Sequence, residues 1–210
     1  MPKNESPDRV AAGRWPMRML REHGPLLLLI LLMMVARSSF ANHYQVPSGS
    51  MQPTLQPGDR VVVDMSAYGL RLPFTGIEVL ARGAPAPGDV VVFKSPGDGT
   101  RLIKRVVAVE GQTVALQQGR LWIDGRPLQV IGDGDAERVG GRVVQLDLAH
   151  GGGPDIVPLT IPEGQVLVLG DHRGNSVDGR YFGLVPADAL YAKAVGVYWR
   201  RGEGPVWKRL

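Results

Sequence analysis

One pattern occurs three times and restricts the possible folds more than any other: a glycine-containing turn followed by an apolar strand. The stretches are QPGDRVVVD at 56–64, APGDVVVFK at 86–94 and PEGQVLVLGD at 162–171. Proline and glycine favour a turn, and a valine run bounded by turns is typical of a buried strand. The 28 glycines and 17 prolines among 210 residues also favour many short elements. We therefore predict a mainly β protein built from antiparallel sheets.

The sequence changes in character between residues 111 and 162. A hairpin is expected about Gly119 and Arg120, followed by loops rich in glycine and charge such as IGDGDAERVGGR. We predict that 112–161 form a smaller β subdomain, inserted into a larger β domain made of 42–111 and 162–210. Apolar runs predict further strands at 102–109, 113–118, 121–124, 143–148 and 194–200.

An apolar segment, GPLLLLILLMMVA, occupies 24–36 and contains no charge. A membrane-spanning helix needs ~20 apolar residues, and a shorter apolar core is typical of a cleavable secretory signal. If the Arg37 side chain reaches the lipid headgroups, the segment extends to residue 41 and falls in the lower range of spanning helices. We therefore expect one N-terminal transmembrane anchor at 24–41.

The basic residues before this segment set its orientation. Because positive charge stays on the cytoplasmic side, we expect 1–23 in the cytoplasm and the chain after Phe40 outside. Two alternatives remain open: a cleaved signal, supported by the small-x-small site at 39–41, and a soluble core helix. The basic residues are Lys3, Arg9, Arg14, Arg18 and Arg21.

Composition excludes several classes of site. The chain has no cysteine, so disulfides, thiol catalysis and thiolate metal sites are excluded. Its four histidines show no metal-ligand spacing, and we expect no metal and no other cofactor. The net charge of +4 comes without clustered basic residues or a recognition motif, so nucleic acid is not an expected partner.

Two stretches carry candidate reactive groups. QVPSGSMQPTL at 45–55 holds Ser48 and Ser50 in a stiff turn, although such clusters are usually plain loops. RLIKRVVAVE at 101–110 places Lys104 among apolar neighbours, where lost hydration lowers a lysine pKa from ~10.4 toward neutrality. Lys104 could then act as a base, whereas Arg105 stays protonated. The alternative is that Lys104 extends its amine into solvent at a strand edge.

A third stretch, GDHRGNSVDGRYFG at 170–183, is polar and follows the apolar run VLVL. Loops at the ends of rigid strands are where functional groups gather. A serine, a desolvated amine and a polar loop together match the Ser-Lys variant of serine hydrolases.

These stretches resemble bacterial type I signal peptidases (leader peptidases). PSGSMQPTL is similar to the serine box of that family, LIKRVVAVEG to its lysine box, and GDHRGNSVDGRYFGLVP to its C-terminal box. The resemblance covers most of the chain, but 112–161 match only as a variable β insertion.

The resemblance implies a role for each matching residue. Ser50 corresponds to the nucleophile and Lys104 to the general base. The Ser48 side chain and the Ser50 backbone N–H correspond to the oxyanion hole, and Ser176 to a hydroxyl that hydrogen-bonds and orients the lysine. The implied small-residue substrate pockets are lined by Val46, Met51, Leu55, Leu102 and Ile103.

In the C-terminal box, the resemblance implies a bracing ion pair between Asp178 and Arg180. Three positions of this box depart from the usual pattern: His172 stands where Asn is common, Gly174 where Asp is common, and Gly179 where Ser is common. None of the three is an implied chemical group, so the departures affect the detail of the loop rather than the reaction.

The implied function is removal of signal peptides from translocated preproteins after small-x-small, Ala-x-Ala-like sites. The implied partners are signal peptides and membrane lipid, with the catalytic domain on the outer side of the bacterial inner membrane. Alternatives are a dedicated maturation peptidase for a pilin or conjugation protein, and a membrane-tethered β binding module without chemistry. The dipeptide Ala12-Gly13 resembles the cleavage site of self-cleaving repressors. This sequence, however, contains no DNA-reading helix pair, and its apolar segment contradicts a cytosolic location.

Overall fold

The structure is a computed structural model that describes residues 23–30, 33, 41–71 and 78–210. The chain divides into two units, 1–38 and 39–210. In the first unit, residues 23–30 are helical. Among the described residues, no helix has the length and apolar character needed to cross a membrane. Of the predicted anchor at 24–41, residues 31–32 and 34–40 lie outside the described residues, as do residues 1–22 of the predicted cytoplasmic segment.

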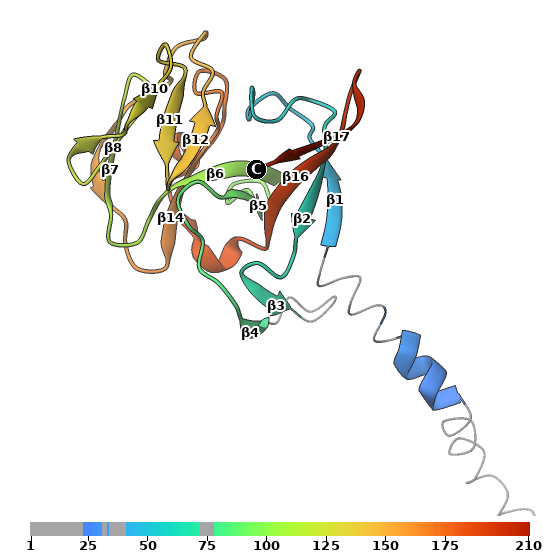
Figure 1. The fold of residues 1–210 in the computed structure, drawn as a ribbon. Helices are drawn as coiled ribbons and strands as arrows, with labels where there is room; N and C mark the ends of the chain where they lie inside the picture. Colours follow the sequence, from blue (N-terminus) through green and yellow to red (C-terminus); the bar gives the residue numbers. More distant parts are fainter. Residues whose placement is uncertain (1–22, 31–32, 34–40, 72–77) are drawn as a thin grey trace, which may run out of the picture. The chain divides into compact units, whose positions relative to one another are not determined.

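The second unit is built on one eight-stranded sheet of order β1-β2-β16-β5-β6-β14-β15, with β17 paired to β16 (Figure 1). Every pairing in it is antiparallel. The three predicted turn-and-strand stretches supply β2, β5 and β14, so the mainly β, antiparallel prediction is confirmed. The strands are β1 (Ala41–Gln45), β2 (Arg60–Asp64), β5 (Val90–Lys94), β6 (Arg101–Val109), β14 (Gln165–Leu169), β15 (Val185–Pro186), β16 (Ala192–Arg200) and β17 (Gly204–Arg209).

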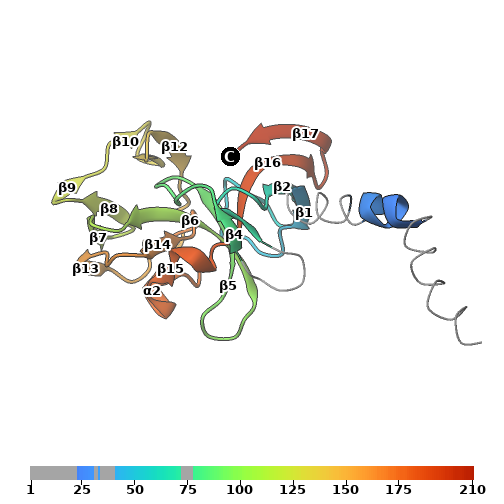
Figure 2. The same ribbon diagram turned by 90° about the horizontal axis from the view of Figure 1, so that it is seen from below.

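Two smaller sheets come from residues 113–160. A four-stranded sheet has the order β13-β7-β8-β9, and a three-stranded sheet the order β10-β11-β12. The predicted hairpin about Gly119 and Arg120 joins β7 to β8. Both views place β7 and β8 on the far side of β6 from β1 and β2 (Figures 1 and 2). The strands are β7 (Thr113–Gln117), β8 (Arg120–Ile123), β9 (Arg126–Pro127), β10 (Val130–Ile131), β11 (Ala136–Val139), β12 (Arg142–Gln145) and β13 (Ile156–Thr160).

The remaining elements are short. A two-stranded sheet pairs β3 (Gly69–Arg71) with β4 (Glu78–Ala81). The α-helix α2 (Gly179–Phe182) and the 3-10 helix η2 (Ala187–Ala189) follow β14 and β15 respectively. Asp178 caps α2 by accepting a hydrogen bond from the Arg180 backbone N–H.

Strand β6 organises the interior because it pairs with β5 on one side and β14 on the other. Its residues enter more than one hydrophobic cluster: Val106 packs with Phe93, whereas Val107 and Ala108 join the cluster that includes β7 and β8. The register with β14 shifts opposite Val107, so simple alternation holds only up to Val106. Before that shift, Lys104 and Arg105 project from opposite faces of a buried strand.

Candidate active site

The loop 46–59 between β1 and β2 carries both predicted serines. Its ends are joined, because Val46 N donates to Asp59 O and Gly58 N donates to Val46 O, both at 2.8 Å. Within this closed loop, Ser50 is 9% exposed, whereas Ser48 is exposed. The fold therefore presents Ser50 from a well-braced loop at the edge of the large sheet.

Lys104 lies in β6 opposite Val91 of β5, and it is 3% exposed. Its Nζ donates to Ser50 Oγ at 2.6 Å, and Ser48 Oγ donates to Ser50 Oγ at 3.4 Å. The structure thus places the predicted amine and hydroxyl in direct contact, although they are 54 residues apart in the chain.

The surroundings of Lys104 disfavour its charged form. Burial lowers the pKa of the Lys104 amine from 10.5 to about 8, against an opposing effect of the Asp178 charge. Among the described residues, no carboxylate lies within ion-pair distance of this amine. Desolvation is therefore the dominant influence, and a neutral amine is accessible close to physiological pH.

The predicted ion pair between Asp178 and Arg180 is present and buried. Arg180 Nε and Nη2 each donate to a different Asp178 carboxylate oxygen at 2.8 Å, and Gly170 N donates to Asp178 Oδ2 at 2.8 Å. Burial raises the pKa of the Asp178 carboxyl, but the hydrogen bonds and charge of Arg180 outweigh it and hold that pKa below its usual value. Arg180 Nη1 also donates to the carbonyls of Gly152 and Arg173. These bonds join the loop after β14 to the segment between β12 and β13.

Ser176 lies close to Ser50 but is not bonded to Lys104. A Cβ placed on Gly170 would clash with both Ser176 Oγ and the Ser50 carbonyl oxygen, so glycine at 170 lets the two serines approach from either side. The Ser176 hydroxyl helps to lower the pKa of Asp178, yet it completes no hydrogen bond of normal geometry with the described residues. The role of orienting Lys104 remains a prediction.

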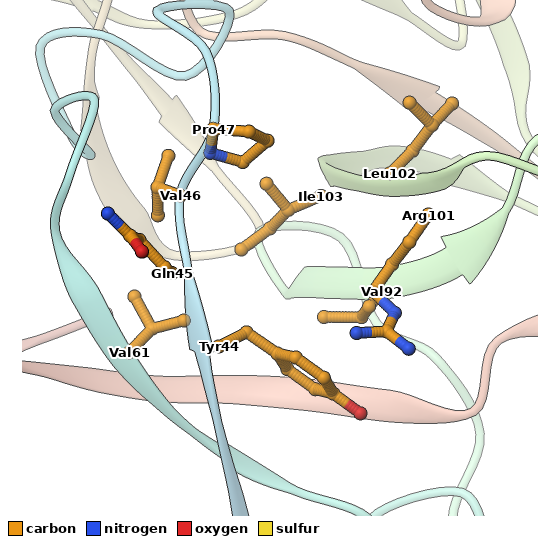
Figure 3. A pocket seen from close by; sticks show the side chains of 9 residues that line it. All are labelled: Tyr44, Gln45, Val46, Pro47, Val61, Val92, Arg101, Leu102 and Ile103. Carbon is orange, nitrogen blue, oxygen red and sulfur yellow. The ribbon is translucent and has the colours of Figure 1, made fainter.

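A pocket of about 210 Å³ is lined by residues that neighbour these groups in the chain (Figure 3). It is lined by the segments 44–47 and 101–103, which directly precede Ser48 and Lys104, and by Val61 and Val92. The Arg101 guanidinium lies over the Tyr44 ring at 4.4 Å from its centroid. Of the five predicted lining residues, the structure places three in this lining and two in the fully buried core cluster that also contains Val46. The three are Val46, Leu102 and Ile103, and the two are Met51 and Leu55.

Sequence reasoning missed a second buried polar pair on the other face of β6. Arg105, 4% exposed, donates from Nε and Nη2 to the two carboxylate oxygens of Asp171 at 2.8 and 2.7 Å. Its Nη1 donates to Gly88 O at 2.8 Å. The sequence does contain a sign of this pair, since Arg105 stands within an apolar strand. A guanidinium buried there requires a carboxylate partner.

A cluster of Asp147, His150 and His172 was also missed. His150 Nδ1 and His172 Nε2 are 3.1 Å apart, and His172 Nε2 is 3.7 Å from Asp147 Oδ2. The backbone N–H of His172 donates to Ser50 O at 3.2 Å, so the cluster adjoins the serine loop. The spacing of the histidines in the sequence gave no sign of this cluster, because the two histidines are 22 residues apart and only the fold brings them together.

Comparison with known proteins shows which family the chain resembles. The profile of the family described as "Signal peptidase, peptidase S26" matches residues 20–199. Signal peptidase I of Pseudomonas aeruginosa is 33% identical over 199 residues, covering 83% of this chain and 69% of that protein. Probable signal peptidase I-1 of Synechocystis is 32% identical over 189 residues, covering 86% of this chain and 83% of that protein.

Among solved structures, a signal peptidase I from Enterococcus faecalis matches 60% of this chain and 99% of its own at 26% identity, with a TM-score of 0.37. The assignment therefore rests on the sequence matches, which span the serine loop, β6 and the loop after β14. On that basis, the chain belongs to the signal peptidase family, peptidase S26, and is a serine endopeptidase of the signal peptidase I type.

Proposed function

We propose that this protein removes signal peptides from translocated preproteins, with Ser50 as nucleophile and Lys104 as general base. The observation that carries the proposal is the 2.6 Å contact between Ser50 Oγ and the Nζ of a lysine that is 3% exposed. An amine that loses its proton near pH 8 can accept one from the hydroxyl with which it is in contact.

Acylation begins when the Ser50 oxygen attacks the carbonyl carbon of the scissile bond. Lys104 takes the hydroxyl proton as the new C–O bond forms, and the negative charge moves to the carbonyl oxygen. When this oxyanion collapses, the C–N bond breaks and the Lys104 ammonium gives its proton to the leaving amine. The products are an acyl-enzyme on Ser50, a free N-terminus and a neutral lysine.

Deacylation repeats the sequence with water. Lys104 takes a proton from water, whose oxygen attacks the ester carbon, and it returns that proton to Ser50 Oγ as the ester bond breaks. The Ser48 hydroxyl, 3.4 Å from Ser50 Oγ, and the Ser50 backbone N–H are the donors that we assign to the oxyanion. We also assign to Ser176 the role of orienting Lys104, because the Ser176 side chain is buried beside Gly170.

The pocket supports a preference for aliphatic side chains near the scissile bond, because Val46, Leu102 and Ile103 contribute apolar groups to its lining. We therefore propose cleavage after small-x-small sites of the Ala-x-Ala type.

Anchoring would bring enzyme and substrate into one membrane. The helical residues 23–30 include four consecutive leucines at 26–29, which have the apolar character that contact with lipid requires. We propose that 24–41 span the bacterial inner membrane, with 1–23 in the cytoplasm and the catalytic unit outside. A shared membrane raises the effective concentration of a signal peptide at the active site.

Replacement of the base tests the proposal. The Lys104→Met variant should fold yet lose about 10²–10⁴-fold in kcat/KM on a panel of preproteins, because it cannot accept the Ser50 proton. In the unaltered protein, activity should rise with pH to a plateau above about 8, since burial lowers the pKa of Lys104 to that value and only the neutral amine acts as a base.

A matched control is Lys94→Met, which removes an exposed lysine from the adjacent strand β5 and should retain activity. Unchanged cleavage by Lys104→Met would refute the Ser-Lys scheme. An acid limb near the ordinary histidine pKa of about 6.5, abolished in His172→Ala, would indicate a histidine base instead.

A further inference from the structure

The cluster of Asp147, His150 and His172 takes no part in the proposed reaction, yet it gathers three side chains of metal-ligand type. One donor atom from each lies within 4.8 Å of the other two. His172 is 4% exposed, Asp147 is partly buried and His150 is exposed. The cluster therefore has a buried floor and a side open to solvent.

The spacing of the donor atoms suits a small divalent ion. Donors at ~2.0–2.2 Å from a tetrahedral zinc ion lie ~3.3–3.5 Å from one another. The contacts of 3.1 Å between His150 Nδ1 and His172 Nε2, and of 3.7 Å between His172 Nε2 and Asp147 Oδ2, fall on either side of that range. The third donor pair lies within 4.8 Å, so binding of one ion by all three donors requires side-chain rotation.

The backbone holds these ligands in place before any ion binds. Asp147 N donates to Asp171 O and Arg173 N donates to Asp147 O, both at 3.0 Å, so Asp147 and His172 lie side by side in a parallel bridge. Ala149 N donates to Asp147 Oδ1 at 2.9 Å, which leaves Oδ2 turned toward His172. A carboxylate oriented by a hydrogen bond on its other oxygen is typical of the support around metal ligands.

Gly174 allows the His150 segment to lie against the loop after β14. A Cβ placed on Gly174 would clash with the carbonyl oxygens of His150 and Gly151. The close backbone approach therefore brings His150 to the ring of His172.

We propose that Asp147 Oδ2, His150 Nδ1 and His172 Nε2 bind one divalent transition-metal ion of the zinc class, with water as the remaining ligand. Two imidazoles and a carboxylate are a donor set that zinc accepts. The ion would join the segment 147–150 to the loop 170–183. Because His172 N donates to Ser50 O at 3.2 Å, this link stiffens the backbone beside the proposed nucleophile.

Zinc binding tests the proposal. The untagged chain in detergent is first treated with a chelator to remove bound metal. Calorimetric titration with Zn²⁺ should give one site per chain, and Co²⁺ should give the visible absorption of a tetrahedral site. Zn²⁺ should also raise the melting temperature, because it binds the folded state. The matched pair of variants is His150→Ala, within the cluster, and His43→Ala, an exposed histidine of β1.

His150→Ala should lower the Zn²⁺ affinity by at least about 10- to 100-fold and lose the thermal shift, whereas His43→Ala should match the unaltered protein. His172→Asn should behave like His150→Ala, and Ser50→Ala should keep the site whether or not the proposed reaction is correct. No Zn²⁺ binding by the unaltered protein, or equal binding by His150→Ala, would overturn the proposal and leave a histidine-histidine hydrogen bond only.

Discussion

Lys104 and Arg105 are neighbours on the buried strand β6, but they lie on opposite faces and meet different partners. Both side chains are almost inaccessible, at 3% and 4% exposure. On one face, the Lys104 amine meets a neutral hydroxyl at 2.6 Å. On the other, the Arg105 guanidinium meets both oxygens of the Asp171 carboxylate and a backbone carbonyl.

The difference shows that partner chemistry, rather than burial alone, decides what a buried cation does. A paired guanidinium keeps its charge, and here it joins β6 to the loop after β14. An amine without a carboxylate partner is pushed toward its neutral form, which is the form that can take a proton. Strand alternation makes the contrast possible, because consecutive residues face different surroundings.

Removing the paired cation should have the largest effect on stability. Arg105→Met leaves the Asp171 carboxylate buried without its counter-ion, and the free energy of unfolding should fall by about 3–5 kcal/mol. Denaturant unfolding of the full chain in detergent measures this loss, with Arg126→Met, at an exposed position of β9, as the control. The double variant Arg105→Met with Asp171→Leu should recover much of the loss. A cost below about 1 kcal/mol for Arg105→Met would mean that the pair is not structural.

The strands that could be predicted from the sequence are those with a strong local pattern. The apolar runs after glycine-containing turns became β2, β5 and β14. Strands without such a pattern were missed. β1, with the sequence ANHYQ, is a strand because it pairs with β2 at a sheet edge, and β13 contains Pro158 and pairs with β7 in an irregular register. Pairing of this kind depends on tertiary partners, which a local pattern does not contain.

The same limit separates the predicted and missed parts of the site. The Ser50 and Lys104 contact was predicted because the surrounding residues resemble known sequence boxes. The partner of Arg105 was not, because Asp171 reaches it only through the neighbouring positions of β6 and β14 in the sheet. Periodicity gives the face on which a side chain lies, but strand order decides what it meets there.

Removing the Lys104 amine, which has no carboxylate partner, should increase the free energy of unfolding rather than lower it. Burial lowers the pKa of Lys104 from 10.5 to about 8, a shift that corresponds to a destabilisation of roughly 3 kcal/mol when the lysine is charged in the unfolded chain. Lys104→Met removes this cost, so at pH 7 it should raise the free energy of unfolding by up to about 3 kcal/mol while it lowers the activity as stated above.

The pH dependence has a definite sign. Below about pH 8 the unaltered protein bears the full cost of the buried lysine; the cost fades as pH rises toward 10.5, where the unfolded lysine also becomes neutral. The stability difference between Lys104→Met and the unaltered protein should therefore shrink across that window, as measured by unfolding at a series of pH values. A difference that is independent of pH would show that hydrophobic packing, rather than charge burial, causes the gain.

The smallest of these effects should come from exchanging one cation for the other on the paired face. Arg105→Lys keeps a positive charge near Asp171, so it avoids the unpaired carboxylate of Arg105→Met. A lysine offers one point of contact instead of a planar fork, and it cannot bind both Asp171 oxygens and Gly88 O in the geometry that the guanidinium uses. We expect a loss of about 1.5–3 kcal/mol in the free energy of unfolding, measured under the same conditions as Arg105→Met. A loss as large as that of Arg105→Met would indicate that the shape of the guanidinium matters more than its charge, whereas no loss would indicate that charge alone holds β6 to the loop after β14.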